Sequence, residues 1–328
     1  MIRILLYSRQ GKMVTDLTHE QLPQVLADPE NLLWVDFESE PVQVCEPILL
    51  KTFGFHPLAV DDALQETHVP KLDDWGNFLY IVLQPVIFDT EGEVHVDTPE
   101  LDAFLGDRYL VTHHDLPIPA LNRVWSSAQR DERHLKLGPD HLLYRITDEL
   151  AVDYMNVIEQ VADEIDTIED QIFDSPRQTI LARAFATKRA MLHMRRCLSP
   201  QREVLNKLAR DDYQVIDVKD RVYFRDVYDH MVRLHDITES LRDLLGGALD
   251  MYLSVINNRM NDIMKTLTII TTLFMPLSFI ASFFGQNFFG PVAPLQRWTS
   301  MPAFIVTMTI ILLTPVGMYM WMRRRGWM

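Results

Sequence analysis

Hydrophobic positions follow one period in the first part of the chain and another in the rest, and the change falls near residue 139. Before it, short apolar runs rich in β-branched and aromatic residues are separated by polar turns, which is the pattern of strands. These runs cover residues 2–7, 32–37, 78–88, 101–105 and 108–112, and a helical pattern covers residues 57–65. The pattern predicts an α/β domain over residues 1–138.

Beyond residue 139 the apolar positions follow the helical period. Those at 158, 161, 165, 168 and 172 are separated by steps of three and four, the spacing of a seam between packed helices. Residues 151–176 carry eight acids and no Lys or Arg, whereas residues 179–198 are basic. We expect an antiparallel pair of helices, one acidic and one basic, whose acidic face either is simply solvated or concentrates cations.

The last part of the chain predicts a long helix and two membrane spans. Residues 219–284 contain one proline, Pro276, so a single helix of 66 residues and about 99 Å is expected. Residues 266–284 and 301–322 are uncharged, and each stretch is long enough to cross a hydrocarbon core of ~30 Å. We divide the chain into a cytosolic α/β domain (1–138), a cytosolic helical stalk (139–262), a first span (263–285), a periplasmic loop (286–300), a second span (301–322) and a basic cytosolic tail (323–328).

The charge distribution assigns the two sides of the membrane. The net charge is −15, yet the residues from 257 onward carry +5, so residues 1–256 carry −20. Such an acidic body argues against nucleic acid as a partner, because phosphate neutralisation needs a basic face. Basic residues precede the first span and follow the second, which predicts an inner-membrane protein with both termini in the cytoplasm. The two cysteines, Cys45 and Cys197, suit a reducing compartment.

One face of the long helix stays polar into the first span. Its positions alternate in steps of four and three. They are Asp250, Ser254, Asn257, Asn261, Met264, Thr268, Thr271, Met275, Ser278 and Ser282. Small hydroxyl residues in membrane helices often form packing interfaces between helices. The alternative is a pore, in which a ring of several copies places this polar stripe around a shared axis, and Met264, Met275 and nearby Leu267 form apolar constrictions.

The first span ends at Gly285, Gln286 and Asn287. The C-terminus of a helix carries partial negative charge, which favours cations at the outer mouth of such a pore. A ring of Asn287 carbonyls would add neutral oxygens, which suit a hydrated Mg²⁺ ion because Mg²⁺ gives up its water reluctantly. These three residues are the predicted selectivity filter.

Three segments of the chain resemble the CorA family of magnesium and divalent-metal transporters. They are residues 223–287, which end in FFGQN, the segment HPLAVDD at 56–62, and the tail RRRGW at 323–327. The resemblance implies a funnel-shaped homopentamer with an α/β cytosolic domain, a long stalk helix that continues into the pore-lining span, and a second span outside it. It also implies passive uptake of Mg²⁺, with Co²⁺ and Ni²⁺ as further cargo, and closure of the pore by cytosolic Mg²⁺ bound between subunits.

The resemblance also assigns roles to individual positions. Asp62 and Asp226 match the carboxylates that sense Mg²⁺ between subunits, and Asp166 on the acidic helix is a further candidate. Asp250 and Asn261 match intracellular pore positions, and the asparagine of the outer filter corresponds to Asn287, as proposed above.

Two departures from the family keep other functions open. Gly285-Gln286-Asn287 replaces the usual Gly-Met-Asn triplet, and residues 288–302 carry no acid to steer cations toward the mouth. Variant triplets also occur in the related zinc-transporting branch, ZntB. The alternatives are therefore a Zn²⁺ or broad-specificity transporter of the ZntB-like branch, and a membrane-anchored metal sensor with little flux. An enzyme is not expected, and His113-His114-Asp115 is interpreted as a polar cluster at a loop end.

Overall fold

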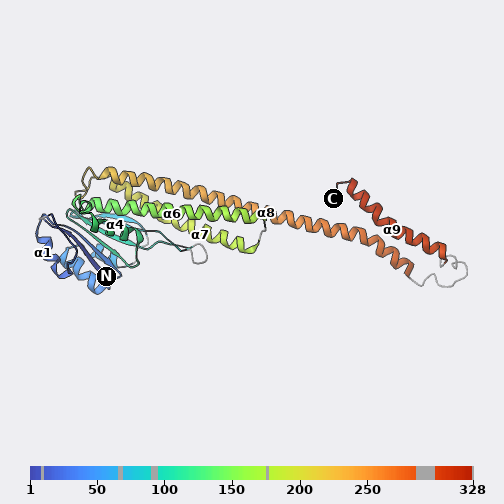
Figure 1. Cartoon of the computed structure of the whole chain (residues 1–328), viewed down its shortest axis with the longest axis horizontal. Coiled ribbons are helices and arrows are strands. Elements are labelled where there is room, and N and C mark those ends of the chain that lie inside the picture. Colours follow the sequence, from blue (N-terminus) through green and yellow to red (C-terminus); the bar gives the residue numbers. More distant parts are fainter. Residues whose placement is uncertain (9–10, 66–68, 90–94, 175–176, 286–299, 327–328) are drawn as a thin grey trace. The chain divides into compact units, whose positions relative to one another are not determined.

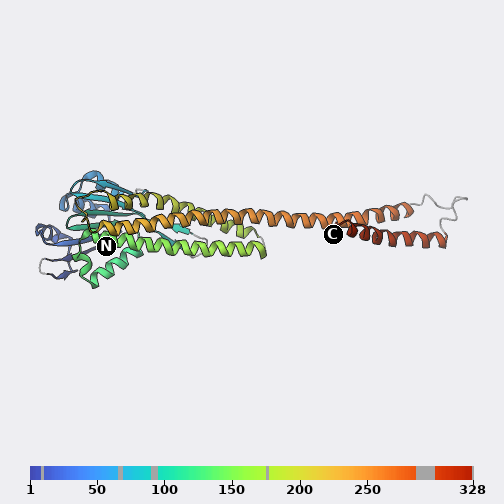
Figure 2. The same ribbon diagram turned by 90° about the horizontal axis from the view of Figure 1, so that it is seen from above.

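The computed structural model describes residues 1–8, 11–65, 69–89, 95–174, 177–285 and 300–326. The chain divides into two units, Met1–Met251 and Tyr252–Met328, and one long helix, α8, contributes to both. Figures 1 and 2 show the first unit as a sheet with helices around it, and the second as helical.

The first unit is built on a seven-stranded sheet with the strand order β2-β1-β3-β9-β8-β5-β4. All neighbouring strands are antiparallel except β3 and β9, which are parallel. The strands are β1 (Ile2–Tyr7), β2 (Met13–Val14), β3 (Leu32–Glu38), β4 (Lys71–Asp74), β5 (Phe78–Leu83), β8 (Leu101–Gly106) and β9 (Tyr109–His114). A separate hairpin pairs β6 (Ile87–Asp89) with β7 (His95–Asp97).

Helices cover both faces of the sheet because the strands are apolar on both sides. One face forms a continuous core with α1 (Leu22–Ala27), α2 (Val42–Pro47), the π-helical turn η2 (Ile48–Thr52) and α3 (Pro57–Leu64). A short 3-10 turn, η1 (His19–Gln21), precedes α1. The other face contacts α5 (Arg133–Lys136) and α6 (Pro139–Asp174), and α4 (Pro119–Arg130) packs on α6. The fold class predicted for this part of the chain, α/β, is confirmed.

The five predicted strands are all present, but the run over residues 78–88 divides into β5 and β6. Strand β5 ends at Leu83, and the backbone N–H of Gln84 donates to Oε1 of Gln201, 2.8 Å away, instead of continuing the ladder. Pro85 follows and has no N–H to offer. Strands β2, β4 and β7 were not predicted, because two to four residues are too few to show a period.

Three long helices follow: α6, α7 (Gln178–Arg210) and α8 (Arg221–Gly285). The predicted seam of α6 is buried, and the acidic and basic helices are neighbours, joined by Arg183, which donates two hydrogen bonds to Glu164 at 2.9 and 2.7 Å. Helix α7 continues beyond residue 198, through Pro200, to Arg210. The side chain of the next residue, Gln201, is buried and accepts the hydrogen bond from the end of β5.

Helix α8 begins against α6. Nδ1 of His141 lies 3.0 Å from Asp220, and the rings of Tyr144 and Tyr223 stack with centroids 4.9 Å apart. From there a buried seam, a row of buried residues spaced alternately three and four positions apart, runs along the helix. Its members are Phe224, Val227, Met231, Leu234, Thr238, Leu241, Leu245, Ala248 and Tyr252. Arg195 of α7 adds an ion pair with Glu239 of α8 at 2.8 Å. The first half of α8 is thus the third helix of a bundle with α6 and α7.

His113 and His114 are not a polar cluster at a loop end, as the sequence led us to expect, but buried residues of β9. Successive residues of a strand point to opposite faces of a sheet, so the two rings enter different buried networks. Nδ1 of His113 lies 3.4 Å from Asp102, which also accepts a hydrogen bond from the Tyr80 hydroxyl at 2.6 Å. On the other face, Nε2 of His114 lies 3.3 Å from Asp36.

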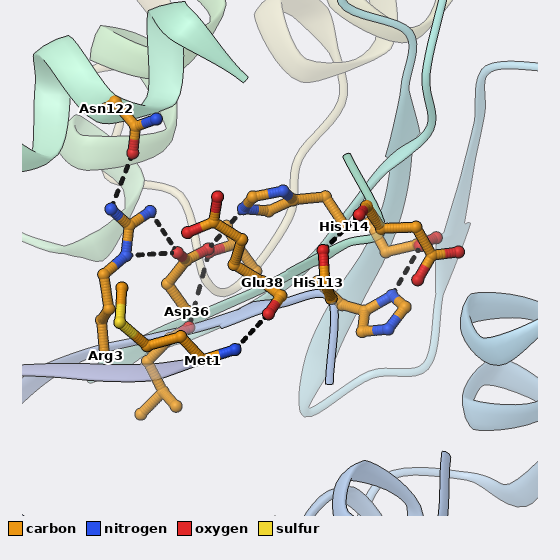
Figure 3. Close-up of polar contacts among 12 residues, drawn as sticks. Met1, Arg3, Asp36, Glu38, His113, His114 and Asn122 are labelled. Atoms are coloured by element: carbon orange, nitrogen blue, oxygen red, sulfur yellow. Dashed lines mark hydrogen bonds and ion pairs between the residues drawn. The ribbon is translucent and has the colours of Figure 1, made fainter. Parts of the chain in front are cut away.

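The network around Asp36 joins the N-terminal strand to α4. Figure 3 shows Arg3 and His114 approaching the Asp36 carboxylate, and Arg3 also donates to Asn122 of α4 at 2.7 Å. Burial acts to raise the pKa of Asp36, but the hydrogen bond from His114 and the charges of His114 and Arg3 outweigh it and hold that pKa below its usual value. The carboxylate is therefore ionised and paired, as a buried charge must be.

The His113 network makes the stability of the protein depend on pH. Burial lowers the pKa of His113, but its hydrogen bonds with Asp102 and Cys45 outweigh burial and raise that pKa to about 9, from 6.5. Because the folded pKa is the higher one, the contribution to stability is complete below about pH 6.5 and is lost as the pH rises through about 9. We expect the wild type to lose on the order of 1–3 kcal/mol more than His113→Gln over this range.

Thermal unfolding of the full-length protein in detergent, followed between these two pH values, measures the difference. His19→Gln is the control, because His19 is exposed on η1. If the wild type and His113→Gln lost stability with the same slope, the raised pKa of His113 would be refuted.

Candidate functional site

The polar stripe of α8 is exposed over its whole length. All ten of its members, from Asp250 to Ser282, are exposed in the single chain. Each residue of an α-helix is rotated by about 100° from the one before it, so Ser254 lies nearly opposite Tyr252, the last member of the buried seam. The stripe therefore begins on the side of α8 opposite to the buried seam.

The threonines of the stripe present oxygen lone pairs outward. Oγ1 of Thr268 donates to the carbonyl of Met264 at 2.7 Å, and Oγ1 of Thr271 donates to the carbonyl of Leu267 at 2.9 Å. A hydroxyl has one proton and two acceptor positions, so a hydroxyl whose proton is used inside the helix offers only acceptors to its surroundings. Acceptors facing outward bind cations or the waters that surround them.

Apolar side chains interrupt the polar ones on the same side of α8. Met264, Leu267 and Met275 leave 56%, 56% and 66% of their surface exposed. Side chains of this size are normally covered, and here they lie beside Asn261 and Thr271. In a ring of helices, such residues would form the narrow apolar steps between polar ones.

Two helices of the described chain are long and apolar enough to cross a membrane, α8 and α9 (Met301–Arg324). Their most apolar windows have mean hydropathies of 1.7 and 1.9, and both windows are exposed in the single chain. Exposed apolar surface of this extent requires lipid or further protein around it. Of the predicted filter, Gly285 is the last residue of α8, and Gln286 and Asn287 lie outside the described residues.

The predicted metal-sensing carboxylates lie on three different helices. Asp62 on α3 forms an ion pair with Lys71, which also pairs with Asp73 at 3.2 Å. Asp226 on α8 and Asp166 on α6 are exposed. Within the residues that the structure describes, no group of three His, Cys, Asp or Glu side chains is placed to hold a metal ion.

Asp148 is a residue that the sequence reasoning missed. It lies on α6, half-buried, where the helix faces the beginning of α8. Burial raises the pKa of Asp148, and the negative charges of Glu149 and Asp226 raise it further, against the opposing charges of Arg145 and His230. A carboxylate with a raised pKa beside another carboxylate gains from a bound cation. No sequence signal indicates that Asp148 and Asp226 interact, because the two residues are 78 positions apart and lie on different helices.

Both the sequence and the fold match known proteins. The profile of the family described as "CorA-like Mg2+ transporter protein" matches residues 29–324. The cobalt/magnesium transport protein CorA of Thermotoga maritima is 34% identical over 284 residues, which are 84% of this chain and 78% of that protein.

Two solved structures share the fold at low sequence identity. The complete structure of the CorA magnesium transporter from Methanocaldococcus jannaschii matches with a TM-score of 0.83 and 22% identity, over 100% of this chain and 99% of that one. The cytoplasmic domain of ZntB from Vibrio parahaemolyticus matches with a TM-score of 0.63 and 12% identity, over 79% of this chain and 98% of that one. Together with the family profile, which covers most of the chain, these matches show that the chain belongs to the CorA-like Mg²⁺ transporter family.

Proposed function

We propose that the protein is a homopentameric channel through which Mg²⁺ passes down its electrochemical gradient, with Co²⁺ and Ni²⁺ as further cargo. The observation that carries the proposal is the exposed polar stripe of α8, whose hydroxyls offer acceptors outward. In a ring of five copies, the stripe of each chain faces a shared, water-filled axis instead of lipid. Membership in a family of transporters supports transport and gives no reason to assign a catalytic reaction.

The path begins at Asp250 and Asn261 on the cytosolic side and ends at Gly285, Gln286 and Asn287 on the outer side. Between them the hydroxyls and amides bind the water of a hydrated ion, so Mg²⁺ does not have to lose its first shell. Met264, Leu267 and Met275 are the apolar steps at which the path closes by excluding water.

The basic residues set the orientation in the membrane. Arg259 and Lys265 precede the first span, and Arg323 to Arg325 follow the second. By the positive-inside rule, both termini lie in the cytoplasm of a cell whose inner (plasma) membrane holds residues 263–285 and 301–322. Residues 139–262 then form the cytosolic stalk, residues 286–300 the outer loop and residues 323–328 the cytosolic tail.

Cytosolic Mg²⁺ closes the channel by binding between subunits. Asp62, Asp226 and Asp148 are the proposed ligands, with Asp166 as a further one on the acidic helix. The absence of any complete metal site within the described part of one chain supports a site shared between copies. Because Mg²⁺ binds to the closed state and not to the open state, a rise in internal Mg²⁺ shifts the population toward the closed state and reduces the flux.

Zn²⁺ is the second candidate cargo because Gln286 departs from the family triplet. The fold does not decide between the two ions, since a CorA structure and a ZntB domain both match it. A metal sensor with little flux has the same architecture and differs only in transport.

Flux into proteoliposomes, at matched Mg²⁺ and Zn²⁺ gradients and with equal pH on both sides, tests the proposal. We expect Mg²⁺ flux that Thr271→Val reduces by about tenfold, because the change removes one outward acceptor from every subunit. Thr266→Val is the matched control: its hydroxyl makes the same bond, to the Asp262 carbonyl at 2.9 Å, but lies off the stripe, so flux should stay within about twofold.

Equal losses in the two valine variants would remove the stripe from the pathway. Zn²⁺ flux with little Mg²⁺ flux would replace Mg²⁺ by Zn²⁺ as the cargo. Absence of both fluxes would leave the sensor as the function.

The sensing carboxylates are tested by the response to internal Mg²⁺. Asp226→Ala and Asp148→Ala should each raise by about tenfold the internal Mg²⁺ needed to halve the flux, because each removes a charged ligand. Asp243→Ala, an exposed acid farther along α8 that pairs with Arg242, should leave that concentration unchanged. An unaltered response in Asp226→Ala would take this residue out of the sensor.

The number of subunits is tested by chemical cross-linking. An amine-reactive reagent applied to the protein in detergent should give a ladder of species that ends at five chains. Asn261→Cys should in addition form a disulfide between subunits, whereas Thr266→Cys on the opposite side of α8 should not; Cys45 and Cys197 are buried and add little background. A ladder that ends at two chains would contradict the shared pore.

A further inference from the structure

The end of α9 carries two aromatic residues and, shortly after them, three arginines. Tyr319 and Trp321 leave 45% and 52% of their surface exposed, and Arg323, Arg324 and Arg325 are exposed as well. Tyrosine and tryptophan are enriched at the level of the lipid headgroups, because each side chain has an apolar ring and a polar group. The two rings therefore mark the depth at which α9 leaves the hydrocarbon.

The arginines lie just beyond this depth. An α-helix rises by about 1.5 Å per residue, so Arg324 is about 4.5 Å farther along the axis of α9 than Trp321. A long arginine side chain can place its guanidinium group several ångströms from its backbone, toward the polar part of the membrane. The phosphate groups of phospholipids are in this layer, and the planar guanidinium group binds phosphate through two parallel hydrogen bonds.

One row of residues along α9 is apolar and ends in an arginine. Its members are all exposed, follow one another in steps of three and four, and are Leu313, Val316, Met320 and Arg324. Residues at this spacing share one face of a helix. A phospholipid has the same order of parts, because its phosphate lies at the end of its acyl chains. The row therefore offers one lipid both an apolar track and a charged end.

Trp321 supports the arginine of the neighbouring row. The guanidinium carbon of Arg325 lies 5.8 Å from the centroid of the Trp321 ring, and the two residues are four positions apart. Such a cation–π contact holds the arginine by its charge. In the described part of the chain the guanidinium group of Arg325 donates no hydrogen bond, so its N–H groups are available to a ligand.

The described part of the chain supplies no counter-charge for these arginines. All described ion pairs lie within residues 1–243. From residue 257 onward the sequence holds six bases and one acid, Asp262. The positive-inside rule explains why bases lie on this side of the membrane, but it does not require three in succession after an exposed aromatic pair. Bases that gather directly beside a membrane span are typical of sites for anionic lipids.

We propose that Arg323, Arg324 and Arg325 bind the headgroup of an anionic phospholipid, phosphatidylglycerol being the simplest. The phosphate accepts hydrogen bonds from the guanidinium groups, and an acyl chain lies along the exposed apolar row of α9. Acids of the cytosolic unit are the alternative partners of these arginines. The inference rests on the proposed function only for the cytoplasmic leaflet as the source of the lipid, and it does not depend on which ion is transported.

Native mass spectrometry of the full-length protein, released from neutral detergent micelles with a chelator present, tests the proposal. Phosphatidylglycerol should bind about tenfold tighter than phosphatidylcholine with the same acyl chains, because only the first carries a net negative charge. The variant Arg324→Gln/Arg325→Gln should weaken binding of phosphatidylglycerol by about tenfold or more, since it removes two charged donors. It leaves Arg323 in place as a basic flank of the second span.

Lys188→Gln/Arg189→Gln is the matched control. It also removes two adjacent exposed bases from a helix, α7, and neither residue forms an ion pair among the described residues. It should change the affinity for phosphatidylglycerol by less than about twofold. Arg324→Lys/Arg325→Lys keeps both charges, so it should weaken binding less than the glutamine variant does.

Three results would each overturn the proposal. The first is equal affinity of the wild type for the two lipids, a comparison that needs no variant and therefore decides even if a variant fails to fold. The second is an equal effect of the two glutamine variants, including no effect of either, which is expected if acids of the protein hold the arginines. The third is displacement of phosphatidylglycerol by an equal concentration of inorganic phosphate, which would make the ligand a soluble phosphate. The measurement contains no transported ion, so its failure would leave the proposed channel untouched.

Discussion

A polar stripe on a helix that must cross a membrane is the constraint on which the rest of the structure depends. A polar side chain facing hydrocarbon costs free energy unless it finds a partner, so α8 cannot stand alone in lipid with Asn261, Thr268 and Thr271 exposed. The described part of one chain supplies no cover for this face. Further copies of the same chain supply it by symmetry, because a rotation about one axis brings identical stripes together.

Helix α8 carries both a buried seam and the polar stripe. The seam, from Phe224 to Tyr252, buries one side of the first half of the helix, and Ser254, near the start of the polar stripe, lies nearly opposite its last member. The start of the helix is held by His141 and Tyr144 of α6. The same part of α8 carries Asp226, whose negative charge contributes to the raised pKa of Asp148 on α6.

The features that the sequence predicted are those that repeat with a helical or strand period. The seam of α6, the length of α8 and the five main strands all follow from spacing, because one face of each must be buried. The interpretation of His113 and His114 was wrong because buried ion pairs do not have a period: each ring is held by a carboxylate from another strand, Asp102 or Asp36. Asp148 was missed for the same reason, since its importance depends on a distant partner.

The chemistry of the stripe argues for a hard cation that keeps its water. Apart from the carboxylate of Asp250, its side-chain donors are neutral oxygens with thioethers between them, and it contains no histidine or thiolate, the ligands that Zn²⁺ prefers. Because Thr268 and Thr271 donate their protons within the helix, they offer only acceptors to their surroundings, and in the proposed pore this chemistry disfavours anions. Acceptors that bind the hydration water let Mg²⁺ keep the water molecules that are bound directly to it. A path that required dehydration would instead favour ions that lose their water more readily. The chemistry of the stripe therefore supports the proposed Mg²⁺ cargo, and Gln286 is the position at which this sequence departs from the triplet of the CorA family.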